Sequence, residues 1–273
     1  MDEIVFLGTG GGRVVMSTQE RATGGFRINT NKFRIQVDPG TGSIVKCREF
    51  HQNPQIIDAL VVTHAHPDHC ADVNVYAEAI MISRSNKKRT FLGSESVING
   101  TQKISPALSK YHKKAFDNIK VMKAGSSFTL KKDDSEIKVK GLKAKHGDET
   151  TFGARFEIKD LNKVISYTSD TTYFEGLVEE HKNSDILILD MTRPRNARLK
   201  KHLCSEDAVK LISEAKPELA LLTHMGMKVL RAGPKEEAAY IQRESGVRTI
   251  PATDGLKVSL HEDEQSTLKE FKK

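Results

Sequence analysis

The run Ala59-Leu60-Val61-Val62-Thr63-His64-Ala65-His66-Pro67-Asp68-His69 joins a continuous apolar stretch to a dense cluster of polar side chains. Its first four residues predict a buried strand, and the polar cluster begins where that strand ends. Imidazole and carboxylate groups are good ligands for zinc, manganese or iron. The run therefore predicts a metal site at the carboxyl end of a strand. The candidate ligands within it are His64, His66, Asp68 and His69.

Three further candidate ligands also stand where a strand-like segment opens into a loop. His146 follows the segment 137–144, Asp170 follows Val164–Tyr167, and His224 follows the apolar segment 219–222. Strand ends gathered on one edge of a sheet can converge on one site. We therefore expect these side chains to join the cluster at 64–69.

The chain-wide pattern predicts an α/β (α+β) fold in which two sheets pack face to face with helices outside, a four-layer αβ/βα sandwich. We expect one domain over residues 1–273. Strands are predicted at 3–7, 33–37, 59–62, 90–92, 119–122, 127–130, 136–143, 152–158, 163–167, 185–189, 219–222, 247–250 and 256–260. Helices are predicted at 68–82, 173–181 and 234–245, and a further helix is predicted to be capped by Ser205.

Composition narrows the classes of protein that this chain can belong to. The 273 residues are 37% hydrophobic and carry a net charge of +7, which favours anionic partners such as phosphate esters or nucleic acid, or simply a charge-rich surface. The three cysteines show no C-x-x-C spacing, which argues against a disulfide framework or a cysteine zinc site and fits a reducing compartment. With a strand-like segment at 4–7, no signal peptide and no membrane span, we expect a cytoplasmic protein. The oligomeric state, including a homo-oligomer, is left open.

These residues and their order resemble the metallo-β-lactamase fold superfamily of hydrolases. The resemblance rests on the run 63–69 and on His146, Asp170 and His224, and it covers nearly the whole chain. It implies a dinuclear centre with two divalent ions, zinc being the first expectation and manganese or iron the alternatives. In that assignment the first ion is held by His64, His66 and His146. The second is held by Asp68, His69 and His224, and Asp170 bridges the two.

A closer resemblance is to the ribonuclease Z-like branch, which includes small-molecule phosphodiesterases. It is carried by Leu7–Gly11, by Val37–Gly40 and by His202–Ser205, where His202 resembles the branch's additional active-site histidine. The chain departs from the transfer-RNA-processing members, because only 23 residues separate His146 from Asp170 and these already predict two strands and a turn. The long RNA-binding arm of those members therefore has no counterpart here.

The expected chemistry uses the two ions to lower the pKa of a water that they share and to polarise the substrate. Asp68 is expected to position that water as well as to bind metal, and His202 to protonate the leaving oxygen or stabilise charge. We expect Asp38 to hydrogen-bond a ligand histidine. A cationic segment beyond Leu189 is expected to bind substrate phosphate. Its candidate contacts are Arg193, Arg195 and Arg198.

Three functions stay open at this level. The first is a phosphodiesterase for a small or cyclic phosphodiester or a short nucleic acid, RNA or DNA. The second is a lactonase or thioesterase, because the same metal pair polarises carbonyl groups. The third is a non-catalytic nucleic-acid-binding protein that uses the fold as a scaffold.

Overall fold

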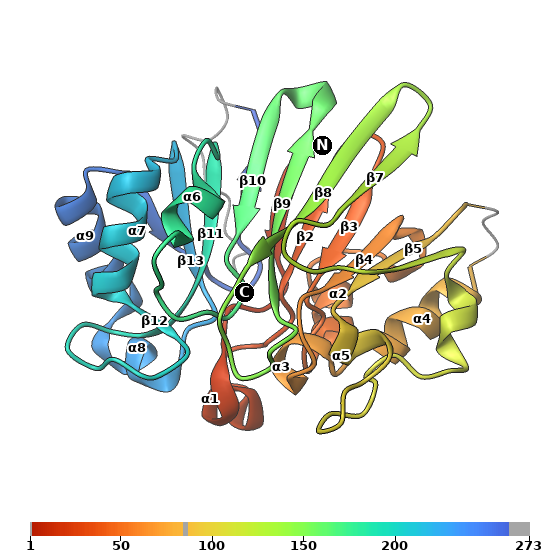
Figure 1. Cartoon of the computed structure of the whole chain (residues 1–273), viewed down its shortest axis with the longest axis horizontal. Helices are drawn as coiled ribbons and strands as arrows, with labels where there is room; N and C mark the ends of the chain where they lie inside the picture. Colours follow the sequence, from red (N-terminus) through yellow and green to blue (C-terminus); the bar gives the residue numbers. More distant parts are fainter. Residues whose placement is uncertain (1, 84–86, 262–273) are drawn as a thin grey trace. The chain divides into compact units, whose positions relative to one another are not determined.

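The computed structural model describes residues 2–83 and 87–261. They form two compact units, the first from residues 2–9, 18–83, 87–122 and 253–261 and the second from residues 10–17 and 123–252. Each unit contains one large sheet and its own helices (Figure 1). The predicted mixed α/β class is confirmed, and the single domain over 1–273 stays a prediction.

The sheet of the first unit has seven strands among the described residues, in the order β15-β1-β2-β3-β4-β5-β6. The strands from β15 to β3 pair antiparallel, and those from β3 to β6 pair parallel. Since β3 and β4 are parallel neighbours, the residues that follow them emerge at the same edge of the sheet. The strands are β1 Glu3–Phe6, β2 Phe26–Asn29, β3 Arg34–Val37, β4 Ala59–Val62, β5 Thr90–Gly93, β6 Asn118–Val121 and β15 Lys257–Ser259.

Helices pack apolar side chains onto this sheet. Cys47 of α2, Tyr76 of α4 and Val97 of α5 share one buried cluster with Leu60 and Val62 of β4. Alternate residues of a strand point to the same face, which is why Leu60 and Val62 meet the helices together. The helices of this unit are α2 Ser43–Glu49, α3 Pro67–Cys70, α4 Val73–Met81 and α5 Glu95–Ile98, with short 3₁₀ turns at Pro54–Ile56 and His112–Ala115.

The sheet of the second unit has eight strands among the described residues, in the order β14-β13-β11-β10-β9-β8-β7, with β12 paired to β11. The strands β7 to β10 are antiparallel, and β10, β11, β13 and β14 are parallel. The carboxyl ends of β10, β11 and β13 therefore lie at one edge. The strands are β7 Ser127–Lys132, β8 Ser135–Lys143, β9 Phe152–Ile158, β10 Lys163–Tyr167, β11 Ile186–Arg193, β12 Leu203–Cys204, β13 Leu219–Thr223 and β14 Thr249–Pro251.

One face of this second sheet carries a helical layer. Leu187 and Leu189 of β11 and Leu222 of β13 share a buried cluster with Leu211 of α7 and Ile241 of α9. The helices are α1 Gly12–Thr18, α6 Leu177–His181, α7 Ser205–Ala215, α8 Met227–Ala232 and α9 Pro234–Ser245, with a 3₁₀ turn at Lys159–Leu161.

Three helix predictions were wrong in their bounds. The helix predicted over 68–82 is two helices, α3 and α4, because Asp72 leaves the helical path: its amide donates to the Pro39 carbonyl and its carboxylate accepts from the Ile44 amide. The helix predicted over 173–181 begins only at Leu177, since Gly176 before it is left-handed (φ 91°). Ser205 is the first residue of α7, whose N-cap is Cys204.

The sequence analysis also missed β2 and the short helices α1, α2, α5 and α8. Strand β2 escapes a hydrophobicity pattern because it carries a fully buried arginine, Arg27. Its guanidinium donates to the Gln36 side chain, the Asn53 carbonyl and Cys47 Sγ. Such buried partners are invisible along the chain, since they come from other elements.

No disulfide joins the cysteines: Cys47, Cys70 and Cys204 are all buried and free. Burial raises the pKa of the Cys204 thiol to about 12, and it also raises the pKa of the Cys47 thiol. Both therefore act as neutral packing groups near pH 7. Over residues 2–83 and 87–261, every helix falls short of the length and apolar character that crossing a lipid bilayer requires.

A buried histidine in the second unit makes stability depend on pH. His181 is fully buried, its Nδ1 lies 2.6 Å from Ser166 Oγ, and its Nε2 has no hydrogen-bond partner among the described residues. Burial, aided by the positive charge of Arg155, lowers the pKa of His181 from 6.5 to about 3. Between pH 6.5 and about 3, the folded state therefore keeps His181 neutral, whereas the unfolded chain would bind a proton there.

We expect the free energy of unfolding to fall as pH decreases from 6.5 toward 3, by at most about 1.4 kcal/mol per pH unit from this group. The sign follows because the unfolded chain binds the extra proton over that range. Urea unfolding of wild type and His181→Gln at pH 7.5, 6, 5 and 4 measures the difference. The variant should lose part of the pH dependence, whereas replacing the exposed His51 with glutamine should leave it unchanged. Identical pH profiles for wild type and His181→Gln would contradict the assignment.

Candidate metal centre

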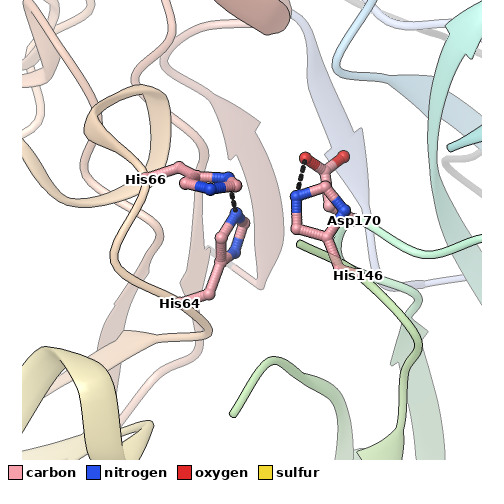
Figure 2. Close-up of side chains that lie close together, drawn as sticks. All are labelled: His64, His66, His146 and Asp170. Carbon is pink, nitrogen blue, oxygen red and sulfur yellow. Dashed lines mark hydrogen bonds and ion pairs between the residues drawn. The ribbon is translucent and has the colours of Figure 1, made fainter. Parts of the chain in front are cut away.

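The first unit holds a cluster of histidines directly after β4. The four residues of β4 are buried, and the chain then passes through Thr63 to His64 and His66 before α3 begins. His64 Nε2 lies 3.1 Å from His66 Nδ1 (Figure 2), and the rings of His64 and His69 have centroids 4.1 Å apart. Imidazole nitrogens at this separation can share a proton or a cation. Asp68, the fourth candidate ligand of this run, is half-buried in α3.

Asp38 fixes the orientation of one of these histidines. It follows β3 at the same sheet edge, and its Oδ2 lies 3.0 Å from His69 Nδ1. The same carboxylate accepts hydrogen bonds from the Thr63 amide and hydroxyl, both at 2.7 Å. A carboxylate on one imidazole nitrogen directs the other nitrogen toward a ligand. Asp38 thus makes the contact expected from the sequence, and its role as support for a metal ligand stays a prediction.

The second unit gathers three imidazoles around one buried carboxylate. Asp170, only 2% exposed, lies in the loop after β10. Its Oδ2 is 3.4 Å from His146 Nε2 (Figure 2), and its Oδ1 is 3.4 Å from His202 Nδ1 and 3.3 Å from His224 Nδ1. The loops after β8, β10 and β13 and the segment before β12 supply these side chains. The predicted convergence of His146, Asp170 and His224 is therefore present within this unit, and His202 joins them.

A second carboxylate, Asp190 of β11, belongs to the same cluster. Asp170, Asp190 and His224 each offer a ligand atom within 4.8 Å of the others. Asp190 is buried, and its Oδ2 accepts a 2.8 Å hydrogen bond from the Tyr167 hydroxyl. The sequence analysis missed Asp190. A signal was available, since Asp190 directly follows the apolar run Ile186–Leu189, although it lies within β11 and not after it.

The imidazoles of His146, His202 and His224 also form hydrogen bonds with uncharged groups, the Lys201 carbonyl and the Thr192 hydroxyl. His146 Nδ1 lies 2.9 Å from the Lys201 carbonyl oxygen, so Nδ1 is the protonated nitrogen and Nε2 faces Asp170. Thr192 Oγ1 lies 3.0 Å from His224 Nδ1 and 3.2 Å from His202 Nδ1. Thr192 was also missed, because a threonine inside a strand gives no sequence signal of such a contact.

The glycine-rich loop at 8–12 packs against His224. A Cβ on Gly11 would lie 2.3–2.4 Å from three atoms of the His224 ring. The loop cannot retreat freely, since Gly10 forms a β-bridge with Met225 and the Gly11 amide donates to the Met225 carbonyl. His224 itself is left-handed, with φ 54°. Gly11 is therefore required by the close approach of backbone to imidazole.

Of the three arginines predicted to bind substrate, two are engaged with acids. Arg195 Nε lies 3.0 Å from Glu237 Oε1, and Arg198 Nη2 lies 2.9 Å from Asp207 Oδ1. Arg193, the last residue of β11, has a buried Nε with no hydrogen-bond partner among the described residues. Substrate contact by these arginines stays a prediction, and Arg193 is best placed to make it.

The donor set fits a divalent metal. Imidazole and carboxylate oxygen are the donors that zinc, manganese and iron accept, and a cluster rich in both suits these ions better than calcium or magnesium. Histidine and aspartate side chains whose ligand atoms lie within 4.8 Å of one another therefore suggest a divalent metal site.

Two sheets with their own helices and His–Asp side chains at strand ends are typical of metal-dependent hydrolases. Comparison with known families leads to the same class of protein. Residues 33–225 match the family model described as beta-lactamase superfamily domain, so the chain belongs to that family. The predicted fold and superfamily are confirmed.

Particular relatives are similar over nearly the whole chain. The uncharacterized protein MJ1374 of Methanocaldococcus jannaschii is 42% identical over 260 residues, covering 94% of this chain and 95% of that protein. Ribonuclease Z of Clostridium novyi is 22% identical, covering 89% of this chain and 94% of that protein. The crystal structure of the metallo-beta-lactamase fold protein YhfI from Bacillus subtilis has a TM-score of 0.73 at 20% identity, covering 94% and 99% of the two chains. The predicted resemblance to ribonuclease Z and to metal-dependent hydrolases is thereby confirmed.

Proposed function

We propose that the protein is a phosphodiesterase that uses two divalent metal ions and acts on small or cyclic phosphodiesters or on short nucleic acids. The observation that carries this proposal is Asp170, a buried carboxylate that three imidazoles approach within 3.3–3.4 Å. Membership of the family and the similarity to a ribonuclease Z support it. The net charge of +7 suits an anionic substrate.

In the proposed centre the two His–Asp clusters act together. His64, His66 and His146 would hold one ion, and Asp68, His69 and His224 the other, with Asp170 shared between them. Asp190 is a further candidate ligand for the second ion, because it lies with Asp170 and His224. Zinc is the ion that this donor set favours first, with manganese or iron as alternatives.

The ions, when bound, would supply Lewis acidity and lower the pKa of water toward neutrality. The chain's own groups would do the rest. The Asp68 carboxylate would orient the attacking water as well as hold metal. His202 faces Asp170 and Thr192 through Nδ1, so Nε2 is the atom that would protonate the leaving oxygen. An 18% exposed side chain leaves His202 accessible to substrate.

Arg193 would bind a non-bridging phosphate oxygen. Its side chain is half-buried and next to Thr192, which contacts both His202 and His224. A guanidinium there would neutralise charge that grows on the phosphoryl group. An ester or lactone substrate carries no such charge and would gain little from Arg193.

Metal analysis of the purified protein, coupled to assays on an aryl phosphodiester, a 2′,3′-cyclic nucleotide, a short RNA and an aliphatic lactone, tests the proposal. We expect metal-dependent cleavage of phosphodiesters and weak activity on the lactone. Arg193→Ala should lower kcat/KM on the phosphodiester by about tenfold or more. Arg243→Ala, an exposed arginine paired with Glu244 on α9, is the matched control and should change little.

Two results would overturn the proposal. One is a metal-loaded protein that cleaves the lactone faster than every phosphodiester. The other is nucleic-acid binding that persists in a metal-free Asp68→Asn variant while no substrate is cleaved, which would indicate a binding protein instead.

A further inference from the structure

Residues 194–202 connect β11 to β12 (Figure 1). This connection supplies one imidazole of the second-unit cluster, His202, and contacts another, His146. We call it the arginine segment. His202 ends it, and the carbonyl of Lys201 accepts from His146 Nδ1 at 2.9 Å. The position of this segment therefore sets the direction of His146 Nε2 and the place of His202 at the same time.

The backbone of the arginine segment is unusual and needs external support. Asn196 and Lys201 both adopt left-handed conformations, with φ 57° and 68°. For a lysine this conformation is unfavourable and persists only where the surroundings impose it. The Lys201 carbonyl that His146 uses belongs to one of these two residues.

Two buried acids from α7 and α9 supply that support. Glu237, 2% exposed, accepts from Arg195 through Nε at 3.0 Å and through the backbone amide at 3.1 Å, and it also accepts from the Ser205 hydroxyl. The Arg195 guanidinium stacks over Tyr240, 4.6 Å from the ring centroid. Glu237 and Tyr240 thus hold the first part of the segment against α9, and the Ser205 hydroxyl of α7 in turn holds the Glu237 carboxylate.

Asp207 performs the same task farther along. Its Oδ1 pairs with Arg198, and its Oδ2 accepts from the Cys204 amide at 3.2 Å, which also caps α7. A third acid, Glu206, accepts from the Asn196 amide at 2.9 Å. Arg195, Asn196 and Arg198 of the segment are therefore all bound to carboxylates of α7 and α9.

We propose that Glu237 and Asp207 are positioning residues that hold the arginine segment so that it presents His202 and orients His146, and that Arg195 and Arg198 brace the segment and do not contact substrate. This inference rests on the proposed function for its catalytic consequence. It changes the role expected for two of the three arginines, because Arg195 and Arg198 are already paired with Glu237 and Asp207.

The test compares Glu237→Ala with Glu236→Ala, the exposed neighbouring glutamate on α9. Trypsin cleaves after lysine and arginine, so its rate of cleavage within the segment measures how firmly the segment is held. The cleavage sites are Arg195, Arg198, Lys200 and Lys201. We expect Glu237→Ala to raise the cleavage rate within residues 195–201 by about tenfold. We also expect kcat on the aryl phosphodiester and the affinity for zinc to fall by about 10- to 100-fold, with KM changing less. Glu236→Ala should match wild type in every measurement.

Two further variants keep the test decisive. Arg195→Ala removes the same contact from an exposed side chain and serves if Glu237→Ala does not fold; it should reproduce the faster cleavage and the lower kcat. Glu237→Gln retains an acceptor for the Arg195 amide and the Ser205 hydroxyl, and should recover part of the loss.

Three outcomes would overturn the inference. They are unchanged trypsin protection in both Glu237→Ala and Arg195→Ala, faster cleavage without any change in kcat or zinc affinity, and a rise in KM alone for Arg195→Ala with protection intact. The last would show that Arg195 binds substrate directly. If wild type hydrolyses no phosphodiester, the proposed function fails, while cleavage rate and zinc affinity still decide the positioning role.

Discussion

Replacing Asp170 with asparagine is expected to abolish tight metal binding and to lower hydrolysis by at least about 100-fold. The carboxylate is 2% exposed and faces His146, His202 and His224 at 3.3–3.4 Å. An amide has the same shape but no charge, and it offers one acceptor oxygen instead of two. The variant thus removes the anionic donor while keeping the volume of the side chain.

Metal content by mass spectrometry and zinc affinity by calorimetry measure the first effect, and turnover of the aryl phosphodiester measures the second. Asp160→Asn, on the exposed turn between β9 and β10, is the control for loss of one negative charge and should behave as wild type. An Asp170→Asn protein that binds zinc with unchanged affinity would show that this carboxylate is not a ligand.

Gly11→Ala is expected to displace His224 and to cost about 100-fold in turnover, since a misplacement of about 1 Å can have that effect. The added methyl group would lie 2.3–2.4 Å from three atoms of the imidazole. The bridge from Gly10 to Met225 holds the loop, so the ring must give way. Overpacking of this kind also lowers the free energy of unfolding by about 1–3 kcal/mol.

Gly12→Ala separates the two effects. Gly12 is left-handed (φ 77°), so alanine there strains the same loop, but its Cβ meets only the Thr192 methyl group, at 3.9 Å. We expect a modest loss of stability with turnover largely retained. Equal turnover losses in the two variants would mean that loop strain, and not contact with His224, limits activity.

The candidate metal ligands could be found from sequence because their signal is local. A metal-binding residue type directly after an apolar strand is visible without knowing the tertiary structure, as His64 and His224 illustrate. The parallel neighbours β10, β11 and β13 then bring distant strand ends to one edge. Asp190 gives a weaker form of this signal, because it follows the apolar run 186–189 but lies within β11 itself.

What sequence could not supply were the partners of charged residues. Arg195 is paired with an acid 42 positions away, and nothing along the chain distinguishes it from Arg193. Strand β2 was not predicted for the same reason, because the partners that allow Arg27 to be buried come from other elements. The break between α3 and α4 likewise depends on contacts of Asp72 with Pro39 and Ile44.

The order of strands in the first unit also affects how the chain folds during synthesis. Strand β1 lies near the beginning of the chain, yet one of its two neighbours is β15, paired through Glu3 and Ser259. All of residues 123–252, which build the second unit, leave the ribosome before that neighbour does. The nascent protein must therefore carry one bare strand edge through most of its translation, and a bare edge can pair with another chain.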